Sequence, residues 1–275
     1  MKRTVLFFSA TGNSLWVARQ LAGEEGETLS IPQLIRQGRY EIEADEIGLV
    51  YPIYGHMPAH LIRMFLNKVT LKADYKFAVL TFGCRKCNAV EILDGITGQA
   101  GWHFDYINTV MMVDNWLPHF DADEQKKMDK HIPEQMEPII NDINAHRHYF
   151  QPTTDLERQQ HQGFLDFSGL DPEVGFLKES ADLFTVTDAC IHCGICTKVC
   201  PRGNYSIVND RAVPQGECEM CLACIHNCPQ KAIRFRTDLH EPLTAEFPEG
   251  EANPNARYRN PNVKVTDIIK ANTTL

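Results

Sequence analysis

The sequence lacks any uninterrupted apolar run that approaches the ~18 residues needed to cross a bilayer as a helix. It also lacks a long basic run, and 36 acidic residues against 27 lysines and arginines give a formal net charge of −9. This balance argues against nucleic acid or an anionic membrane surface as the main partner. The first residues, Met1-Lys2-Arg3 and then Val5–Phe8, imitate a signal peptide, but Thr11–Ser14 ends the apolar run too early. We therefore expect a cytoplasmic protein with no membrane span.

Disorder is also excluded as the state of the whole chain. Hydrophobic residues make up 43% of the sequence and charged residues 23%, which is enough apolar material for a packed core. A length of 275 residues allows two compact domains, or one large domain with an appendage.

The cysteines are unevenly distributed, with 8 of the 10 between positions 190 and 228. They form two copies of the pattern Cys-x2-Cys-x2-Cys-x3-Cys-Pro, offset by 28 residues: Cys190, Cys193, Cys196 and Cys200, then Cys218, Cys221, Cys224 and Cys228. A disulfide framework would suit a short secreted chain and not this one. A zinc ribbon would need only two Cys-x2-Cys pairs, whereas an iron–sulfur cluster accounts for three closely spaced thiolates and a more distant fourth.

This segment resembles bacterial two-cluster ferredoxins. The resemblance implies that the fourth cysteine of each copy binds the cluster held by the other copy. One [4Fe–4S] cluster is then assigned to Cys190, Cys193, Cys196 and Cys228, and the second to Cys218, Cys221, Cys224 and Cys200. We expect Gly194 to permit a tight turn in the first copy and Ala223 to be a small residue at a crowded place in the second. His192 and His226 are expected to be surface residues near the clusters.

A different pattern opens the chain. The apolar, β-prone run Thr4–Phe8 leads into Ser9–Ser14 and then into a segment of helical period over Leu15–Leu21. A strand, a loop of small hydroxyl residues and a helix N-terminus together make an anion site. The loop lacks the lysine of a Walker motif, so a nucleoside triphosphate is disfavoured and a single terminal phosphate fits better.

This loop resembles the phosphate loop of flavodoxins, which follows the first strand and binds the phosphate of FMN. The resemblance implies that the phosphate ligands are Ser9, Thr11, Gly12, Asn13 and Ser14. The alternative is an ordinary polar turn between a strand and a helix.

Two later loops would complete a flavin site in a flavodoxin-like sheet, where ligands bind at the carboxyl ends of the strands. The strand Ile47–Tyr51 leads into the first of these loops, and the strand Phe77–Thr81 leads into the second. By this resemblance the residues near the ring are Pro52, Ile53, Tyr54, Gly55, Thr81, Phe82, Gly83 and Cys84. Tyr54 is the candidate for stacking on the ring, although a half-buried loop aromatic is an equal alternative.

The second loop departs from the flavodoxin pattern because it contains Cys84-x2-Cys87. A redox dithiol beside the flavin is one interpretation, since Arg85 and Lys86 would favour a thiolate. We favour two ordinary loop residues, because no second pair is present to complete a metal site.

The predicted fold class is α/β, with a flavodoxin-like, doubly wound, parallel sheet of five strands in the order 2-1-3-4-5 and a small α+β ferredoxin domain. The predicted parts are an FMN-binding domain over 1–150, a connector without strong period over 151–187, a two-cluster ferredoxin domain over 188–236 and a tail over 237–275. In the tail we expect a helix from Val265 to Ala271, lying across another surface without chemistry of its own. This order resembles flavodoxin–ferredoxin fusion proteins of anaerobic microbes.

The leading hypothesis is an electron-transfer protein that passes single electrons between two [4Fe–4S] clusters, FMN and a redox partner. The clusters and the FMN phosphate deepen the negative charge, so we expect a basic docking surface on that partner. One alternative is a flavin-dependent oxidoreductase acting on a small-molecule acceptor, although the sequence has no Gly-x-Gly-x-x-Gly motif for a nicotinamide cofactor. Another is a ferredoxin with an empty flavodoxin-like docking domain.

Overall fold

The structure is a computed structural model that describes residues 2–180, 183–236 and 252–273. The predicted tail over 237–275 therefore lies partly outside the described residues. Among the residues that are described, no helix is both long and apolar enough to cross a membrane.

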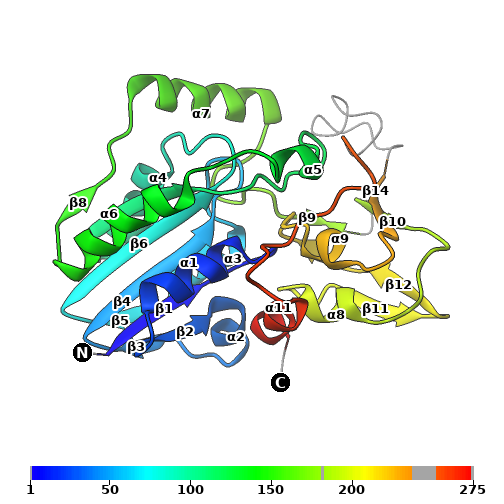
Figure 1. The fold of residues 1–275 in the computed structure, drawn as a ribbon, viewed down its shortest axis with the longest axis horizontal. Coiled ribbons are helices and arrows are strands. Elements are labelled where there is room, and N and C mark those ends of the chain that lie inside the picture. Colours follow the sequence, from blue (N-terminus) through cyan, green and yellow to red (C-terminus); the bar gives the residue numbers. More distant parts are fainter. Residues whose placement is uncertain (1, 181–182, 237–251, 274–275) are drawn as a thin grey trace.

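A parallel sheet of six strands forms the centre of the N-terminal part (Figure 1), in the order β2-β1-β4-β6-β7-β8. Its strands are β1 (Arg3–Phe7), β2 (Glu27–Ser30), β4 (Glu46–Pro52), β6 (Tyr75–Phe82), β7 (Tyr106–Met111) and β8 (Tyr149–Phe150). Two further short strands, β3 (Glu41–Glu43) and β5 (Thr70–Lys72), form a separate parallel pair. The central strands are apolar on both faces, as a sheet covered by helices on both sides requires.

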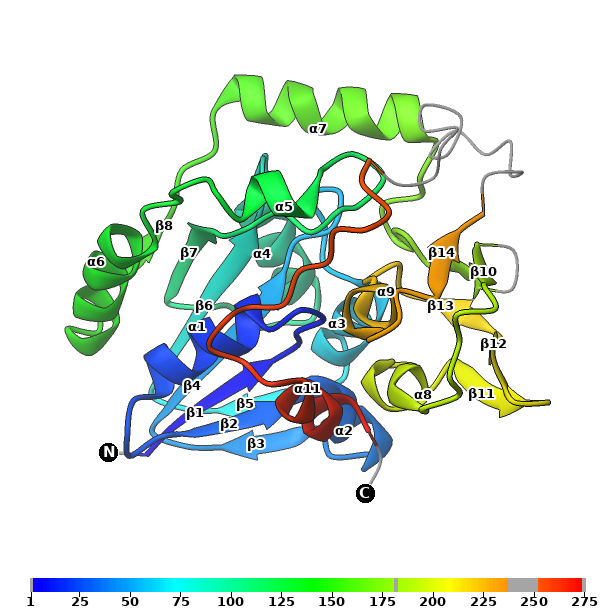
Figure 2. The ribbon, with the colours of Figure 1, turned by 45° about the vertical axis from the view of Figure 1, so that its right-hand side comes forward.

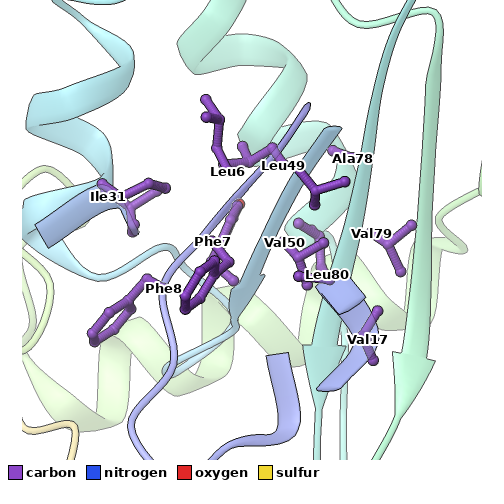
Figure 3. Packing of buried hydrophobic residues seen from close by; sticks show 14 of the residues in the cluster. Leu6, Phe7, Phe8, Val17, Ile31, Leu49, Val50, Ala78, Val79 and Leu80 are labelled. Atoms are coloured by element: carbon purple, nitrogen blue, oxygen red, sulfur yellow. The ribbon is translucent and has the colours of Figure 1, made fainter. Parts of the chain in front are cut away.

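Helices cover both faces of this sheet, with α1 and α6 on one face and α3 and α4 on the other (Figure 1). The helices of this part are α1 (Asn13–Ala22), α2 (Ile31–Arg36), α3 (His60–Leu66), α4 (Ala89–Gln99), α5 (Ala122–Gln125) and α6 (Ile132–Asn144). Figure 3 shows part of the core that results, with Phe7 of β1, Phe8 directly after it, Val50 of β4 and Leu80 of β6. Mixed α/β architecture with a large parallel sheet is therefore confirmed.

The sheet has six strands, so the predicted count of five is wrong. The additional strand, β8, has only two residues and pairs with the beginning of β7 at the edge of the sheet. Tyr149 lies against Tyr106 there, with 5.8 Å between the ring centroids. A strand of two residues is too short to give a periodic signal, because alternation is recognisable only over four or more residues.

The predicted connector contains a helix of 14 residues, α7 (Asp155–Ser168), that its sequence period did not reveal. Thr154 and Glu157 form a capping box at its start, and Gly169 adopts a left-handed conformation at its end. The helix lacks a regular apolar stripe, because its buried residues are His161 and Ser168 while Leu156 and Phe167 are exposed. The capping residues therefore indicate this helix in the sequence, whereas hydrophobic periodicity does not.

The cysteine-rich part lies beside the carboxyl edge of the large sheet (Figure 2). It contains short antiparallel pairs and two single-turn helices: β9 (Lys178–Glu179), β10 (Phe184–Val186), α8 (Ile195–Val199), β11 (Tyr205–Val208), β12 (Arg211–Pro214), β13 (Glu217–Cys218), α9 (Ala223–Asn227) and β14 (Ile233–Phe235). The strand pairs are β9 with β13, β10 with β14, and β11 with β12. A second hydrophobic cluster fills this part, around Phe184, Ile225 and Phe235.

The described C-terminal segment, residues 252–273, runs between the two parts and ends in α11 (Val265–Asn272) (Figures 1 and 2). The predicted tail helix is therefore present. Arg36 of α2 donates hydrogen bonds to the backbone carbonyls of Pro201 and Asn272, and so joins the sheet part, the cysteine-rich part and the tail.

A matched pair of glycines tests the packing of the sheet. In Gly48→Ala a Cβ would lie 2.4 Å from the ring of Phe77 on the neighbouring strand, so we expect the free energy of unfolding to fall by about 1–3 kcal/mol. Gly95 lies on the exposed side of α4, and a Cβ added there would have no neighbouring atom within 4 Å. Gly95→Ala should therefore raise the free energy of unfolding by about 0.5–1 kcal/mol. Urea unfolding followed by circular dichroism measures both, and equal changes in the two variants would contradict the packing described.

Candidate functional site

A cavity of about 600 Å³ lies at the carboxyl ends of β1, β4, β6 and β7. This is the edge at which doubly wound α/β sheets bind ligands. The predicted flavin-site residues that line it are Ser9, Thr11, Asn13, Ser14, Pro52, Ile53, Tyr54, Gly55, Thr81, Phe82, Gly83 and Cys84. Three loops that are far apart in the sequence therefore meet at one cavity, whose volume suits a small-molecule cofactor.

The loop before α1 has small polar side chains that bond to one another. The Ser9 hydroxyl accepts a hydrogen bond from the Gly12 amide at 3.1 Å, and the Ser14 and Thr81 hydroxyls are 2.8 Å apart. Gly12 itself does not line the cavity. Its φ of 98° is one that only glycine adopts readily, and it turns the chain into the helix. Because the first amides of a helix have no acceptor within the helix, this loop fits a phosphate group.

Tyr54 stands between the cavity and the cysteine-rich part. Its ring packs edge-on against Phe8 with 6.4 Å between centroids, and its hydroxyl is buried with no hydrogen-bond partner among the described residues. Burial raises the pKa of Tyr54 well above its usual range, and the nearby Cys221 raises it further. The phenol is therefore neutral, and its flat ring forms part of the cavity wall.

A fourth loop, Asp114–Pro118, follows β7, and its polar and aromatic sequence fits either a border of the cofactor site or a cap on the sheet. Asp114, Asn115 and Trp116 of this loop line the cavity. Burial raises the pKa of Asp114, although the backbone amide of Trp116 donates a hydrogen bond to its carboxyl group at 2.9 Å. The only sequence signal was that this polar and aromatic turn follows a buried strand.

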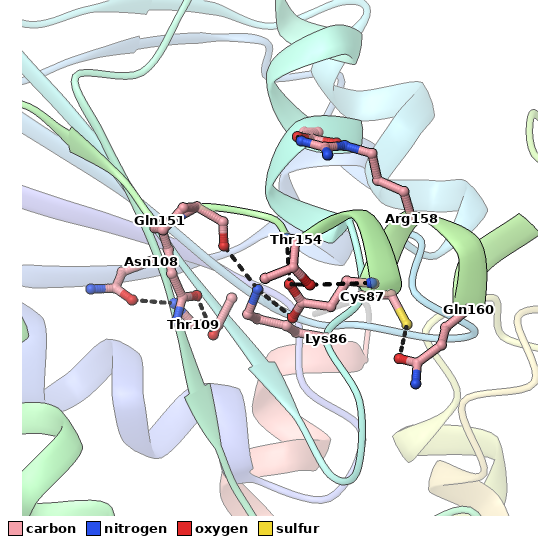
Figure 4. A network of polar contacts seen from close by, with 11 residues as sticks. Lys86, Cys87, Asn108, Thr109, Gln151, Thr154, Arg158 and Gln160 are labelled. Atoms are coloured by element: carbon pink, nitrogen blue, oxygen red, sulfur yellow. Dashed lines mark hydrogen bonds and ion pairs between the residues drawn. The ribbon is translucent and has the colours of Figure 1, made fainter.

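Helix α7 supplies another wall that the sequence did not predict, through Gln160, Gly163, Phe164 and Phe167. Polar contacts hold the first half of the helix over the loop after β6 (Figure 4). Lys86 pairs with Glu157 at 2.7 Å, and Arg158 pairs with Glu91 of α4 at 2.6 Å.

The second half of α7 is held by a pair of histidines. The Nδ1 atoms of His56 and His161 are 3.3 Å apart and both rings are buried. Burial, together with the nearby His161 and Arg85, lowers the pKa of His56 to about 4, and burial also lowers the pKa of His161, so the pair is neutral near pH 7. Two neutral rings can share one hydrogen bond here without the cost of a buried charge.

Cys84 and Cys87 behave as two separate residues. Both are free, with Cys84 exposed in the cavity wall and Cys87 buried with its sulfur 3.9 Å from the Gln160 side-chain oxygen. Burial raises the pKa of Cys87, and this effect outweighs the opposing influence of Arg85 and Lys86. The geometry thus favours ordinary loop residues over a reactive dithiol.

The two cysteine motifs share one backbone design. Gly194 and Leu222 follow the second cysteine of their motifs, and both adopt left-handed conformations, with φ of 73° and 59°, as N-caps of α8 and α9. His192 and Met220 precede those cysteines and also have positive φ. The left-handed residue of the second motif is thus Leu222, and the small Ala223 that follows it is fully buried. A leucine held in this conformation is strained, so the surrounding structure must impose it.

The first, second and third cysteines of one motif meet the fourth cysteine of the other. Cys190, Cys193, Cys196 and Cys228 line one small pocket. Burial, together with the neighbouring Cys193, Cys228 and Cys190, raises the pKa of Cys196 to about 12. In the second set, burial raises the pKa of Cys221, and the neighbouring Cys200 and Cys218 also raise it. Four thiolates this close need a bound cation, and each [4Fe–4S] cluster takes four cysteine ligands.

Backbone amides point at several of these sulfurs. The amides of Asn204, Met220 and Ala232 donate to the sulfurs of Cys200, Cys218 and Cys228, each at 3.3 Å. Such bonds stabilise the thiolate form and tune the potential of a bound cluster. In the part of the chain that the structure describes, no three His, Cys, Asp or Glu side chains are placed to hold a single metal ion. In a [4Fe–4S] cluster each thiolate would bind a different iron, so its four ligands need not converge on one ion.

The second cysteine motif also borders the large cavity. Met220, Cys221 and Leu222 line it together with the loops of the sheet. Two of the four cysteines of the second set, Cys221 and Cys224, are buried. In the first set Cys193 is exposed, and so are the neighbouring Ile191 and Ile207. One cysteine set therefore adjoins the cavity, while the other reaches the surface.

The two histidines near the motifs differ from each other. His192 is exposed as predicted, but His226 is buried in α9, so the prediction of a surface residue is wrong there. Its Nε2 lies 2.8 Å from the backbone oxygen of Asn115, and its Nδ1 accepts a hydrogen bond from the Tyr258 amide at 3.1 Å. Burial lowers the pKa of His226 to about 4, so the ring is a neutral link between loops.

Comparison with known proteins identifies part of the chain. The family model for a 4Fe-4S binding domain matches residues 184–205. The chain is 44% identical over 48 residues to a component of the ion-translocating oxidoreductase complex of Methanosarcina acetivorans, a match over 17% of this chain and 18% of that protein. It is 35% identical over 49 residues to the ferredoxin-like protein in nif region of Trichormus variabilis, over 17% of this chain and 42% of that one.

Two solved structures show weak similarity. One is a flavoprotein in complex with FMN from Lactobacillus acidophilus, with 15% identity and a TM-score of 0.30 over 39% of this chain and 92% of that one. The other is a flavoprotein described as putative from Bacteroides uniformis, with 15% identity and a TM-score of 0.29 over 46% of this chain and 96% of that one. The chain thus contains a 4Fe–4S binding domain, and the ferredoxin-like relatives support electron transfer.

The crossed cysteine sets predict a selective effect of Cys200→Ala. This change should damage the cluster held by Cys218, Cys221 and Cys224 and spare the one held by the sequence neighbours of Cys200. Iron analysis should fall from about eight per chain towards about four, and electron paramagnetic resonance should retain one cluster signal. Cys84→Ala, outside both motifs, is the control and should leave the iron content unchanged. Loss of the Cys190 cluster alone would contradict the assignment.

Proposed function

We propose that the chain is an electron-transfer protein that passes single electrons between a redox partner, two [4Fe–4S] clusters and FMN. One observation carries the proposal: Met220, Cys221 and Leu222 line the same cavity as the loop over Ser9–Ser14 and the loops after β4 and β6. A flavin in this cavity would lie beside the second cysteine set. FMN supplies both one-electron and two-electron chemistry when it is bound.

The proposed phosphate ligands are the amides and hydroxyls of the loop before α1, at Ser9, Thr11, Asn13 and Ser14, with Gly12 giving the turn. The proposed ring site lies between the two later loops, with Tyr54 on one side and Gly83 on the other. Phe164 of α7 and Trp116 are half-buried in the wall of this cavity, and a bound flavin would displace water from beside them. Exclusion of water strengthens the electrostatic influence of the protein on the flavin.

The two cysteine sets take different roles in this proposal. The cluster held by Cys218, Cys221 and Cys224 exchanges electrons with the flavin, because Cys221 lines the cavity wall. The set with Cys190 and Cys193 exchanges electrons with the partner, because it reaches the surface beside the exposed side chains of Ile191, Ile207 and Val208. We propose a partner with a basic docking surface, since the chain carries −9 before cofactors are added.

The proposed division of labour follows the predicted parts: an FMN domain over 1–150, a connector over 151–187 and a two-cluster domain over 188–236. A cytoplasmic location belongs to the same proposal.

A second candidate function is a flavin-dependent oxidoreductase for a small-molecule acceptor. The apolar wall formed by Phe164, Phe167 and Phe176 favours it, because such a surface could hold a planar molecule beside the ring. Steady-state turnover with candidate acceptors and no protein partner separates this function from electron transfer alone.

Removing two hydroxyls from the proposed phosphate loop tests the flavin site. The double change Thr11→Val and Ser14→Val removes two hydrogen-bonding groups, each worth ~1.5–3 kcal/mol when bonded to a charged group. We expect the visible flavin bands of anaerobically purified protein to disappear, while iron stays at about eight per chain.

The control for this test is Thr70→Val, an exposed position on β5 away from the cavity. It should retain the flavin bands of the wild type. A double variant that binds flavin as the wild type does would show that the phosphate role is wrong, and a wild type without flavin after incubation with FMN would favour an empty docking domain.

A further inference from the structure

The C-terminal segment makes direct contacts with the proposed phosphate loop, more than 240 residues away in the sequence. The backbone amide of Asn260 donates to the carbonyl oxygen of Thr11 at 2.8 Å. A Cβ on Gly12 would lie only 2.8 Å from the Cβ of Val263 and 3.1 Å from that of Asn260. The segment therefore lies directly on the turn of the loop, so that Gly12 leaves room for the tail as well as adopting its unusual φ.

The side chain of Asn13 is held at both ends of its amide group. Its oxygen accepts hydrogen bonds from the Tyr258 hydroxyl at 2.6 Å and from the Asn260 side-chain amide at 3.2 Å. Its nitrogen donates to the carbonyl oxygen of Val113 at 3.1 Å. Asn13, Tyr258 and Asn260 are all buried, so these bonds do not compete with bulk water.

The segment is itself fixed by the cysteine-rich part. The Tyr258 amide donates to His226 of α9, and the other nitrogen of that ring contacts the backbone oxygen of Asn115. The side-chain amide of Asn115 in turn donates to the hydroxyl of Thr11 at 2.7 Å. Two series of contacts therefore lead from His226 to the phosphate loop. One reaches Asn13 through Tyr258 of the tail, and the other reaches Thr11 through Asn115 of the loop after β7.

We propose that Tyr258 and Asn260 are positioning residues of the FMN phosphate site, and that they fix Asn13 and the turn at Gly12 in the conformation that receives the phosphate. The inference rests on the proposed function, because it concerns the same cavity. A loop of small polar residues loses conformational entropy when it closes around an anion. A loop that is already ordered by buried contacts avoids that loss and binds more tightly.

Comparison of FMN with riboflavin tests this inference, because riboflavin has the ring but not the phosphate. The protein is used with both clusters assembled and with flavin removed, and flavin fluorescence is titrated under anaerobic conditions. In Tyr258→Phe only the hydroxyl is lost, and we expect FMN affinity to fall by about fivefold with riboflavin affinity unchanged. Adding Asn260→Ala should bring the loss of FMN affinity to about tenfold or more.

The matched control is Asn262→Ala, an exposed asparagine two residues beyond Asn260. It should change neither affinity. Circular dichroism and iron content report whether each variant is folded and loaded.

Each result has a distinct meaning. Unchanged FMN affinity in Tyr258→Phe would overturn the inference while leaving the flavin site intact. An equal loss of FMN and riboflavin affinity would also overturn it, since it would indicate general damage to the cavity. A wild type that binds neither flavin would overturn the proposed function, and the inference with it.

Discussion

The buried imidazole of His226 connects three parts of the chain: the cysteine-rich part, the loop after β7 and the C-terminal segment. It lies on the single-turn helix between Cys224 and Cys228, and its two nitrogens contact the loop after β7 and the backbone of Tyr258. Because a buried polar group without a partner is costly, both contacts must form together when the cysteine-rich part packs on the sheet. The position of the second cysteine set beside the cavity depends on this packing.

Charge imposes a second constraint on the same region. Cys221 and Cys224 of the second set are buried, and the nearby carboxylate of Glu219 is buried as well, paired with Arg202 at 2.7 Å. Unpaired thiolates would not be stable at such depth, and in the proposed site the iron of a cluster would compensate their charge. The amides directed at the sulfurs, and the left-handed residues Gly194 and Leu222, help to fix the backbone around the cysteines of both motifs. Ile191 and Ile207, which line the pocket of the first set, are exposed.

Much of this arrangement could be predicted from local patterns. The apolar strand Thr4–Phe8 and the loop after it gave the position of α1, and the cysteine spacing gave the two motifs, because these features depend on neighbouring residues. Helix α7 was missed because its capping residues Thr154 and Glu157 carry the signal and its apolar face is small. The burial of His226 and the contacts of Tyr258 were missed because they depend on how distant segments pack. No periodicity in the tail reveals that Asn260 lies on the loop at Thr11.

The proposed function requires that a cluster held by the second cysteine set and a flavin bound in the cavity exchange electrons within a single molecule. The most direct measurement is the rate of flavin reduction after flash photoreduction of the clusters, recorded at several protein concentrations. The account predicts a first-order rate that does not change with protein concentration, because Cys221 lines the cavity itself. A rate that rises in proportion to protein concentration would show that the clusters serve a neighbouring molecule and would contradict the account.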